Sequence, residues 1–354
     1  MSGKFSGELE HLSLEKADIA NKAQKVISEL QADAIYSVVD ILKDDIFKIK
    51  NKKYYIVIDD LDKDWVDVSI VYDLIRALIV TINELKSIPG TKIIIALRDN
   101  LYEKTFQFGD VRGMQREKYR QLNLILDWNH IYLKELLNRR LARLMKNQYS
   151  NNVPTIEDVM PKATGNKLSG FDYLIKRTLL RPRDVIAFFN KCIDKSNGQS
   201  TITRETLSLA EPEYSRERLE AIEDEWLENF GSILPMTFFL KGTIGYFRFR
   251  DIREIDIEKT LLANVLDKQS ALQKIQDDYI SGTIEFDLAV KQILCILYRV
   301  GILGAKLSAS ETTLYAHSST MNLEPADILD ETKFYVHLMF HAALKINPKA
   351  TTVD

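Results

Sequence analysis

Residues 54–60, YYIVIDD, mark the point where the chain changes from a helical to an extended pattern. The run Tyr55–Ile58 is continuously apolar and rich in β-branched residues, and Asp59 and Asp60 close it. Such a run is typical of a strand that is buried on both faces of a parallel sheet. We therefore predict a buried β-strand here, with two carboxylates at its carboxyl end.

A helix and a second strand are expected directly after this first strand. Apolar residues recur at helical spacing over 68–88, and 92–97 (KIIIAL) is again a short apolar run, followed by Arg98. A strand–helix–strand order forms a right-handed parallel crossover by default. Asp59, Asp60 and Arg98 then follow neighbouring strands of one parallel sheet.

Most of the remaining chain has helical periodicity. Helices are predicted over 17–48, 131–146, 169–178, 181–196, 213–230, 254–266 and 286–299. Strands are predicted over 122–126, 303–308 and 312–317, with a strand or hairpin over 5–16 and a linker over 196–203. Helices followed by two short strands suggest a winged-helix module, so we expect one at the C-terminal end.

Composition favours a helix-rich globular protein with no strong electrostatic preference for a partner. Of the 354 residues, 45% are hydrophobic and 28% are charged, and the net charge of −3 gives no overall attraction to nucleic acid or to an anionic membrane. Cys192 and Cys295 stand far apart, which disfavours a disulfide framework or a thiolate metal site. The first twenty residues are polar and no apolar run could cross a bilayer, so we expect a cytoplasmic protein without membrane contact.

The two carboxylates and the arginine suit Mg-nucleotide chemistry. Ligands of open α/β sheets bind at the carboxyl edge of the strands. In that interpretation Asp59 holds Mg²⁺ through water, Asp60 orients or activates the attacking water, and Arg98 senses the γ-phosphate. Acidic turns are also common after apolar strands, because Asp favours turns. The strand alone therefore leaves both a structural turn and an ATPase site open.

Four blocks in this order resemble a prokaryotic P-loop ATPase related to the KAP and STAND groups. They are IVIDDLDKDW (56–65), KIIIALRDN (92–100), LILDW (124–128) and RTLLRPRDVIAFFN (177–190). In the resemblance they correspond to Walker B, the sensor strand, the fifth-strand region and a helix of the lid. Segments 214–226, 296–306 and 334–340 resemble recurring parts of the C-terminal domain of that family.

The resemblance implies an α/β plus α protein with a partial P-loop NTPase parallel sheet, a helical lid and a winged-helix-like domain. It divides the chain into an N-terminal strand and helical segment (1–50), the Walker B and sensor part of the ATPase core (51–145), the lid (146–203) and the winged-helix-like domain (204–354). It implies ATP and Mg²⁺ as cofactors, Asp60 and Arg98 as catalytic residues, Asp59 at the metal, and Arg181 and Arg183 at the nucleotide phosphates. Such proteins are often found in bacterial conflict and antiphage systems, which indicates an ATP-dependent regulatory or defence component.

The arginines of RPRD have a second interpretation. Pro182 suits the first position of a helix and Asp184 suits its first turn. Arg181 and Arg183 could therefore cap this helix and form salt bridges instead of contacting phosphate.

The phosphate-binding loop of that family is absent from these 354 residues. No GxxxxGK[ST] occurs, and in Ser2–Phe5 (SGKF) a Phe takes the place of the Mg-binding hydroxyl. Without such a loop no backbone N–H groups cradle the phosphates. In the family this loop follows the central strand of the sheet, so its loss would leave two apolar strand edges unpaired. We expect ATP hydrolysis only if a missing N-terminal P-loop segment or a protein partner supplies the loop, and an oligomer is compatible with this.

A non-catalytic interaction or regulatory protein is the second hypothesis. Its winged-helix domain would bind a protein partner or DNA. The helix predicted over 286–299 offers Lys291, Gln292 and Arg299 but is mostly apolar. Packing or protein contact is therefore favoured over DNA contact.

Overall fold

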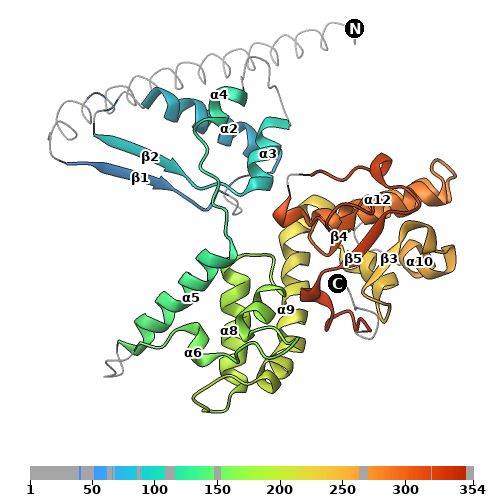
Figure 1. The fold of residues 1–354 in the computed structure, drawn as a ribbon. Helices are drawn as coiled ribbons and strands as arrows, with labels where there is room; N and C mark the ends of the chain where they lie inside the picture. Colours follow the sequence, from blue (N-terminus) through green and yellow to red (C-terminus); the bar gives the residue numbers. More distant parts are fainter. Residues whose placement is uncertain are drawn as a thin grey trace, which may run out of the picture. The chain divides into compact units, whose positions relative to one another are not determined.

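The computed structural model describes residues 40, 52–61, 66, 68–85, 88, 90–107, 116–146, 153–262, 270–319 and 321–347. The chain divides into two compact units, Met1–Ile125 and Leu126–Asp354. Each unit combines helices with a small sheet, so the fold is mixed α/β (Figure 1). The strand or hairpin predicted over 5–16 lies outside the described residues, as does the helix predicted over 17–48 apart from Asp40.

The first unit contains a parallel pair of strands. β1 (Tyr54–Ile58) and β2 (Thr91–Ile95) pair in register from Tyr54 opposite Thr91 to Ile58 opposite Ile95. The connection between them contains α2 (Val68–Leu85), as Figure 1 shows. The predicted strand–helix–strand unit is therefore confirmed.

Two further helices follow β2, namely α3 (Asp99–Gln107) and α4 (Arg116–Arg120). α2 packs on α3, and Ile75 of α2 is fully buried. Beside it the Arg76 side chain donates from Nε to the carbonyl of Thr105 at 3.1 Å. This hydrogen bond links α2 to α3. Because the arginine is almost entirely buried, loss of the bond would leave its guanidinium without this partner away from water.

The prediction that β1 is buried on both faces is wrong for the part of the chain that the structure describes. Tyr55 is 62% exposed, Val57 is 64% exposed, and Ile56 and Ile94 are each 42% exposed. Among the described residues the parallel sheet consists of β1 and β2 alone. A sheet of two strands has an edge on each side and cannot cover its own apolar side chains.

The strand predicted over 122–126 is also absent. These residues lie in an irregular stretch, and Leu124, Ile125 and Leu126 are 85%, 84% and 79% exposed. Apolar residues form a strand only where a neighbouring strand pairs with their backbone. No described strand pairs with this stretch, which explains the difference.

Five helices are described in the first part of the second unit, apart from residues 147–152, and several start at recognisable caps. They are α5 (His130–Met145), α6 (Ile156–Val159), α7 (Gly170–Ile175), α8 (Pro182–Lys195) and α9 (Arg204–Phe230). The Asn129 side chain accepts a hydrogen bond from the N–H of Tyr132 and so caps α5. Thr203 caps α9 through the N–H of Thr206, so this helix begins well before the predicted residue 213.

The C-terminal part combines short helices with an antiparallel sheet. In chain order it contains η2 (Leu234–Leu240), β3 (Tyr246–Arg248), α10 (Glu254–Leu261), α11 (Ala271–Ile280), α12 (Phe286–Arg299), β4 (Leu303–Lys306), η5 (Pro325–Asp327), β5 (Lys333–Val336) and η6 (Leu338–Phe340). The strands are ordered β3-β5-β4, and both pairs are antiparallel. Helix α12 and strand β4 confirm the predictions for 286–299 and 303–308.

The strand predicted over 312–317 is wrong, and β5 pairs with β4 in its place. In that stretch a single bridge joins Leu314 to Ala305. In β5, Phe334 and Val336 alternate with half-buried residues and are 0% and 3% exposed. The later segment therefore buries a continuous apolar stripe against the core, which 312–317 does not offer.

Helix α9 joins the helical part of the second unit to its C-terminal part. The ring of Tyr214 stacks on Phe188 of α8 with centroids 4.3 Å apart. The next residue, Ser215, donates to the carbonyl of Met339 at 2.6 Å and accepts from the N–H of Ala343 at 3.0 Å. One core of buried side chains thus extends on both sides of residue 203, and the domain boundaries expected at 145–146 and 203–204 stay predictions.

Truncation of one inward side chain of α5 tests this core. Leu137→Ala should lower the free energy of unfolding by about 2–5 kcal/mol, because Leu137 is fully buried and its removal leaves a cavity. Leu144→Ala in the same helix is the control, with an expected change within about 0.5 kcal/mol, since Leu144 is 58% exposed. Urea unfolding followed by circular dichroism measures both, and equal losses would contradict the burial of α5.

Candidate functional site

The carboxyl edge of the parallel strands carries three of the predicted site residues. Asp59 and Asp60 follow directly on β1, and Arg98 stands three residues after the end of β2. The N–H of Ala96 donates to the carbonyl of Ile58 at 2.8 Å, so the two chain segments leave the sheet side by side. The structure therefore places all three at one edge, as the strand order predicts.

The backbone at Asp60 has a specific conformation. Its φ angle is 63°, in the left-handed region, where Asn and Asp are the residues that occur most readily after Gly. Its N–H donates to Oδ1 of Asp59 at 2.8 Å. The turn thus holds the Asp59 carboxylate against the backbone, and both side chains are exposed at the edge.

The donor set at this edge fits a magnesium ion that arrives with a nucleotide. Within the described ranges no cluster of three or more His, Cys, Asp or Glu side chains could hold a metal by itself. Mg²⁺ is usually held by one or two carboxylates, with waters and substrate phosphates completing its octahedron. Asp59 and Asp60 supply that number of carboxylates, and Arg98 adds a positive charge at the same edge.

In the second unit, the two arginines of RPRD have different environments. Arg181 is the N-cap residue of α8, and its Nη1 lies 2.6 Å from Oε2 of Glu225 in α9. Arg183 is exposed, and it forms no ion pair with any residue in the described part of the chain. The salt-bridging interpretation therefore describes Arg181, while Arg183 presents its guanidinium to solvent.

The aspartate of RPRD is a structural anchor. Asp184 is 3% exposed and accepts from the N–H of Leu179 at 3.1 Å and from Nη1 of Arg218 at 3.0 Å. Pro182 occupies the first turn of α8, as predicted. These bonds fix the direction in which α8 leaves the preceding loop, and with it the position of Arg183.

A third ion pair nearby joins the segment that follows α7 to α9. Arg177 Nε lies 2.8 Å from Glu211 Oε1, and both side chains are largely buried. The Arg177 guanidinium also lies 3.6 Å from the centroid of the Tyr173 ring, whose hydroxyl donates to Glu211. Burial raises the pKa of Tyr173 above its usual range, so the hydroxyl stays protonated and can donate this bond.

Three histidines of the C-terminal part lie close together, and sequence spacing pairs only two of them, His337 and His341. His317 and His337 have ring centroids 5.4 Å apart, and His341 Nε2 lies 3.0 Å from the carbonyl of Val336. His337 accepts the N–H of Met339 through Nδ1. The sequence gives no sign that His317, from a different segment, joins them, because only tertiary packing brings it there.

Burial keeps these imidazoles neutral. It lowers the pKa of His317 to about 4, and the charge of Arg181 acts in the same direction. Burial also lowers the pKa of His337 far below its usual range, and that of His341 less. These neutral rings therefore contribute to packing, and protonation of a ring would place an unfavourable charge in the core.

One family model matches the chain, over residues 132–223, and it is described as the FunZ-associated C-terminal helical domain. The matched segment begins in α5 and ends in α9, and it includes Arg181, Arg183 and Asp184. No curated protein and no solved structure matches the chain. In the part of the chain that the structure describes, no helix is both long and apolar enough to cross a membrane.

The buried pair at the start of α8 gives a stability test. Asp184→Asn keeps the shape of the side chain but leaves Arg218 without its counter-charge, so the free energy of unfolding should fall by about 2–4 kcal/mol. Arg183→Ala in the same turn should change it by less than about 0.5 kcal/mol. Urea titrations of both variants decide this, and a stable Asp184→Asn protein would refute the anchoring role.

The histidine cluster predicts instability in acid. Because the folded-state pKa of His317 is near 4 and that of the unfolded chain is near 6.5, the unfolded state binds more protons between these values. The free energy of unfolding should therefore be unaffected by His317 above pH 6.5 and fall by about 3 kcal/mol as the pH drops to 4. The depressed pKa of Glu213, about 2, adds a further loss that begins near the unfolded-state value of 4.5, at the acid end of this window.

Replacement of the histidine isolates its contribution. Unfolding free energies of the wild-type protein and of His317→Gln are measured between pH 7.5 and 4. The slope between pH 6.5 and 4 should be shallower in the variant. An identical slope in the two proteins would show that His317 is not buried in its neutral form.

Proposed function

We propose that these residues belong to a Mg-ATP-dependent regulatory protein of the P-loop ATPase type, which acts as an antiphage-defence component. The observation that supports this best is the juxtaposition of Asp59, Asp60 and Arg98 at the carboxyl edge of two parallel strands. Acidic and cationic side chains at such an edge are the arrangement that Mg-nucleotides require. The match to a FunZ-associated helical domain over 132–223 is consistent with a defence context.

In this proposal each residue has a distinct role. Bound Mg-ATP supplies the phosphoryl group that is transferred to water. The Asp59 carboxylate holds the hydration shell of the metal, and its bond to the N–H of Asp60 orients it. Asp60 accepts a proton from, or orients, the attacking water, and Arg98 binds the γ-phosphate oxygens. Of the RPRD arginines, exposed Arg183 is better suited than Arg181 to reach a phosphate.

The phosphate-binding loop comes from outside these 354 residues in this proposal. A further segment of the polypeptide or a protein partner would supply it, together with the strand that precedes it. The exposure of Tyr55, Val57 and Ile94 on β1 and β2 supports a missing neighbour, because apolar strand residues gain stability when another element covers them.

We further propose a winged-helix-like arrangement for the C-terminal part of the second unit. It is supported by the sheet order β3-β5-β4, with α10, α11 and α12 between β3 and β4 in the chain. Helix α12 buries most of its apolar residues, including Ile293, Leu294 and Leu297, so little of it is available to read DNA. A protein contact suits this part better than DNA.

A substitution at Asp60 tests the proposed ATPase. Asp60→Asn can keep the left-handed backbone, since Asn adopts this conformation readily, but it removes the proton acceptor. In the complete protein or complex that contains this chain, ATP turnover should fall about 10²–10⁴-fold while binding of the non-hydrolysable analogue β,γ-imido-ATP persists. Phosphate release and calorimetry measure the two quantities.

The matched control is Asp127→Asn, which removes an exposed carboxylate in the loop before α5 and should leave turnover unchanged. Turnover at the wild-type rate in Asp60→Asn would reject the role of Asp60. Absence of Mg-dependent hydrolysis in the wild-type complex would reject the ATPase itself and favour a non-catalytic interaction protein.

A further inference from the structure

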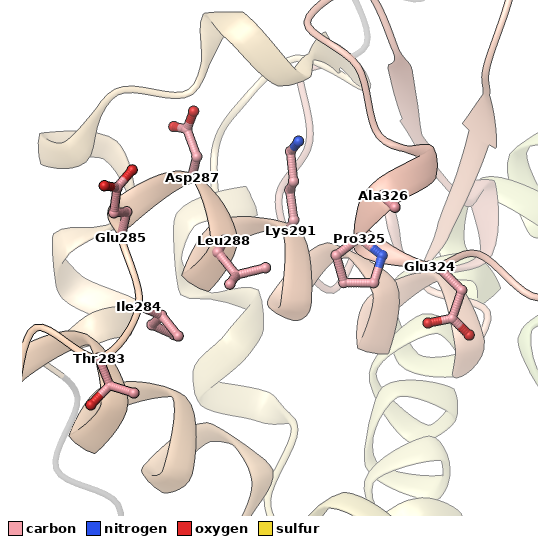
Figure 2. Close-up of a pocket in the computed structure, with 9 residues that line it drawn as sticks. All are labelled: Thr283, Ile284, Glu285, Asp287, Leu288, Lys291, Glu324, Pro325 and Ala326. Carbon is pink, nitrogen blue, oxygen red and sulfur yellow. The ribbon is translucent and has the colours of Figure 1, made fainter.

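A surface hollow of about 670 Å³ lies beside the first half of α12, where η5 faces the helix (Figure 2). Ile284, Leu288 and Pro325 form its apolar part. Leu288 is 38% exposed, although the next two residues of the helix, Ala289 and Val290, are fully buried. The hollow therefore presents apolar surface that α12 does not use for its own packing.

Carboxylates surround this apolar floor. Glu285 and Asp287 come from the start of α12, and Glu324 comes from the residue that precedes η5. Figure 2 shows Glu285 and Glu324 at opposite ends of the hollow, with Leu288 between them. Glu285 and Asp287 also suit a helix N-terminus, but Glu324 belongs to another element and carries the negative charge to the far side.

The single cation of the hollow is directed elsewhere. Lys291 Nζ lies 5.0 Å from the centroid of the Phe249 ring, in reach of a cation–π interaction. Burial, together with the charges of Glu324 and Asp327, raises the pKa of the Cys295 thiol of α12 to about 12. With three carboxylates on its rim and the Lys291 ammonium directed toward Phe249, the hollow has a negative potential.

We infer that this hollow, with floor Ile284, Leu288 and Pro325 and rim Glu285, Asp287 and Glu324, docks a segment of a partner protein that carries a lysine or arginine next to an apolar side chain. The apolar side chain of the partner covers Leu288, and its cation lies between the carboxylates of the rim. The complementary charge orients the segment, while the apolar contact supplies most of the affinity. This docking does not depend on the proposed ATPase activity.

The same charges exclude nucleic acid from this face. DNA binding draws its affinity from lysines and arginines that neutralise phosphates. Glu285, Asp287 and Glu324 would instead repel the backbone of a duplex at the exposed start of α12. A DNA contact through this end of the helix would have to overcome that repulsion.

Defined peptides test the docking on the full chain. The probe is a fluorescein-labelled peptide of sequence Gly-Leu-Arg-Leu-Arg-Gly, with two comparison peptides in which Glu replaces Arg or Ser replaces Leu, and a labelled 20-base-pair DNA duplex. Fluorescence anisotropy gives each affinity. The Leu-Arg peptide should bind at least about tenfold more tightly than the Leu-Glu peptide, the Leu-Ser exchange should weaken binding, and the duplex should not compete.

Two variants locate the site. Glu285→Lys with Asp287→Lys should weaken the Leu-Arg peptide at least about tenfold, and Leu288→Glu, which adds charge but removes the apolar floor, should weaken it as well. The matched control is Glu220→Lys with Glu228→Lys on the exposed side of α9, which changes the net charge equally and should leave binding unchanged.

Several outcomes would overturn the inference. The chain would contradict it by binding the Leu-Glu peptide as tightly as the Leu-Arg peptide, by preferring the duplex to the peptides, or by binding no peptide at all. If the two double variants weakened binding of the Leu-Arg peptide equally, the binding would reflect only non-specific charge attraction. Circular dichroism of each variant shows that it is folded before its affinity is compared.

Discussion

The long helix α9 is the element on which the second unit depends. On one side the Tyr214 ring stacks against Phe188 of α8, and the Tyr214 hydroxyl donates to the carbonyl of Arg177. On the other side Ser215 satisfies both a carbonyl and an N–H of the C-terminal segment. The buried Ser215 hydroxyl both donates and accepts a hydrogen bond. It therefore fixes the position of α9 against the C-terminal segment, because any displacement of the helix would leave polar groups unpaired.

The same helix determines which arginines of the second unit are available for ligands. Glu211, Arg218 and Glu225 of α9 engage Arg177, Asp184 and Arg181 in turn. Most of the charged side chains near the start of α8 therefore have a partner of opposite charge within the second unit. Arg183, which has no such partner among the described residues, is left facing solvent. A motif with two arginines thus contains one structural and one exposed side chain.

In the first unit, parallel pairing of two strands brings charged side chains to one edge of the sheet. Because β1 and β2 are in register up to Ile58 and Ile95, the residues that follow each strand leave the sheet together. Asp59 and Asp60 after one strand, and Arg98 after the other, thus lie at the same edge of the sheet although about forty residues separate them in the sequence. The apolar side chains of these two strands stay exposed. The proposed function therefore includes a further element that covers them.

The sequence-based predictions succeeded where local chemistry is decisive. The β-branched runs before Asp59 and Arg98 are strands, and Pro182 with Asp184 starts a helix, because backbone preference and helix capping act over a few residues. The strands predicted over 122–126 and 312–317 failed for a different reason. A strand needs a partner backbone, and whether one is present depends on segments far away in the chain.

The sequence by itself thus determined the parallel strand–helix–strand unit, the edge on which Asp59, Asp60 and Arg98 lie, and the helical character of the segments around RPRD. Tertiary structure alone decided that Arg181 pairs with Glu225, that His317 joins His337, and that Glu324 completes an acidic rim beside α12. Periodicity and capping are properties of neighbouring residues, whereas ion pairs, buried clusters and surface hollows arise between segments separated by tens of residues, whose approach only the packed core can specify.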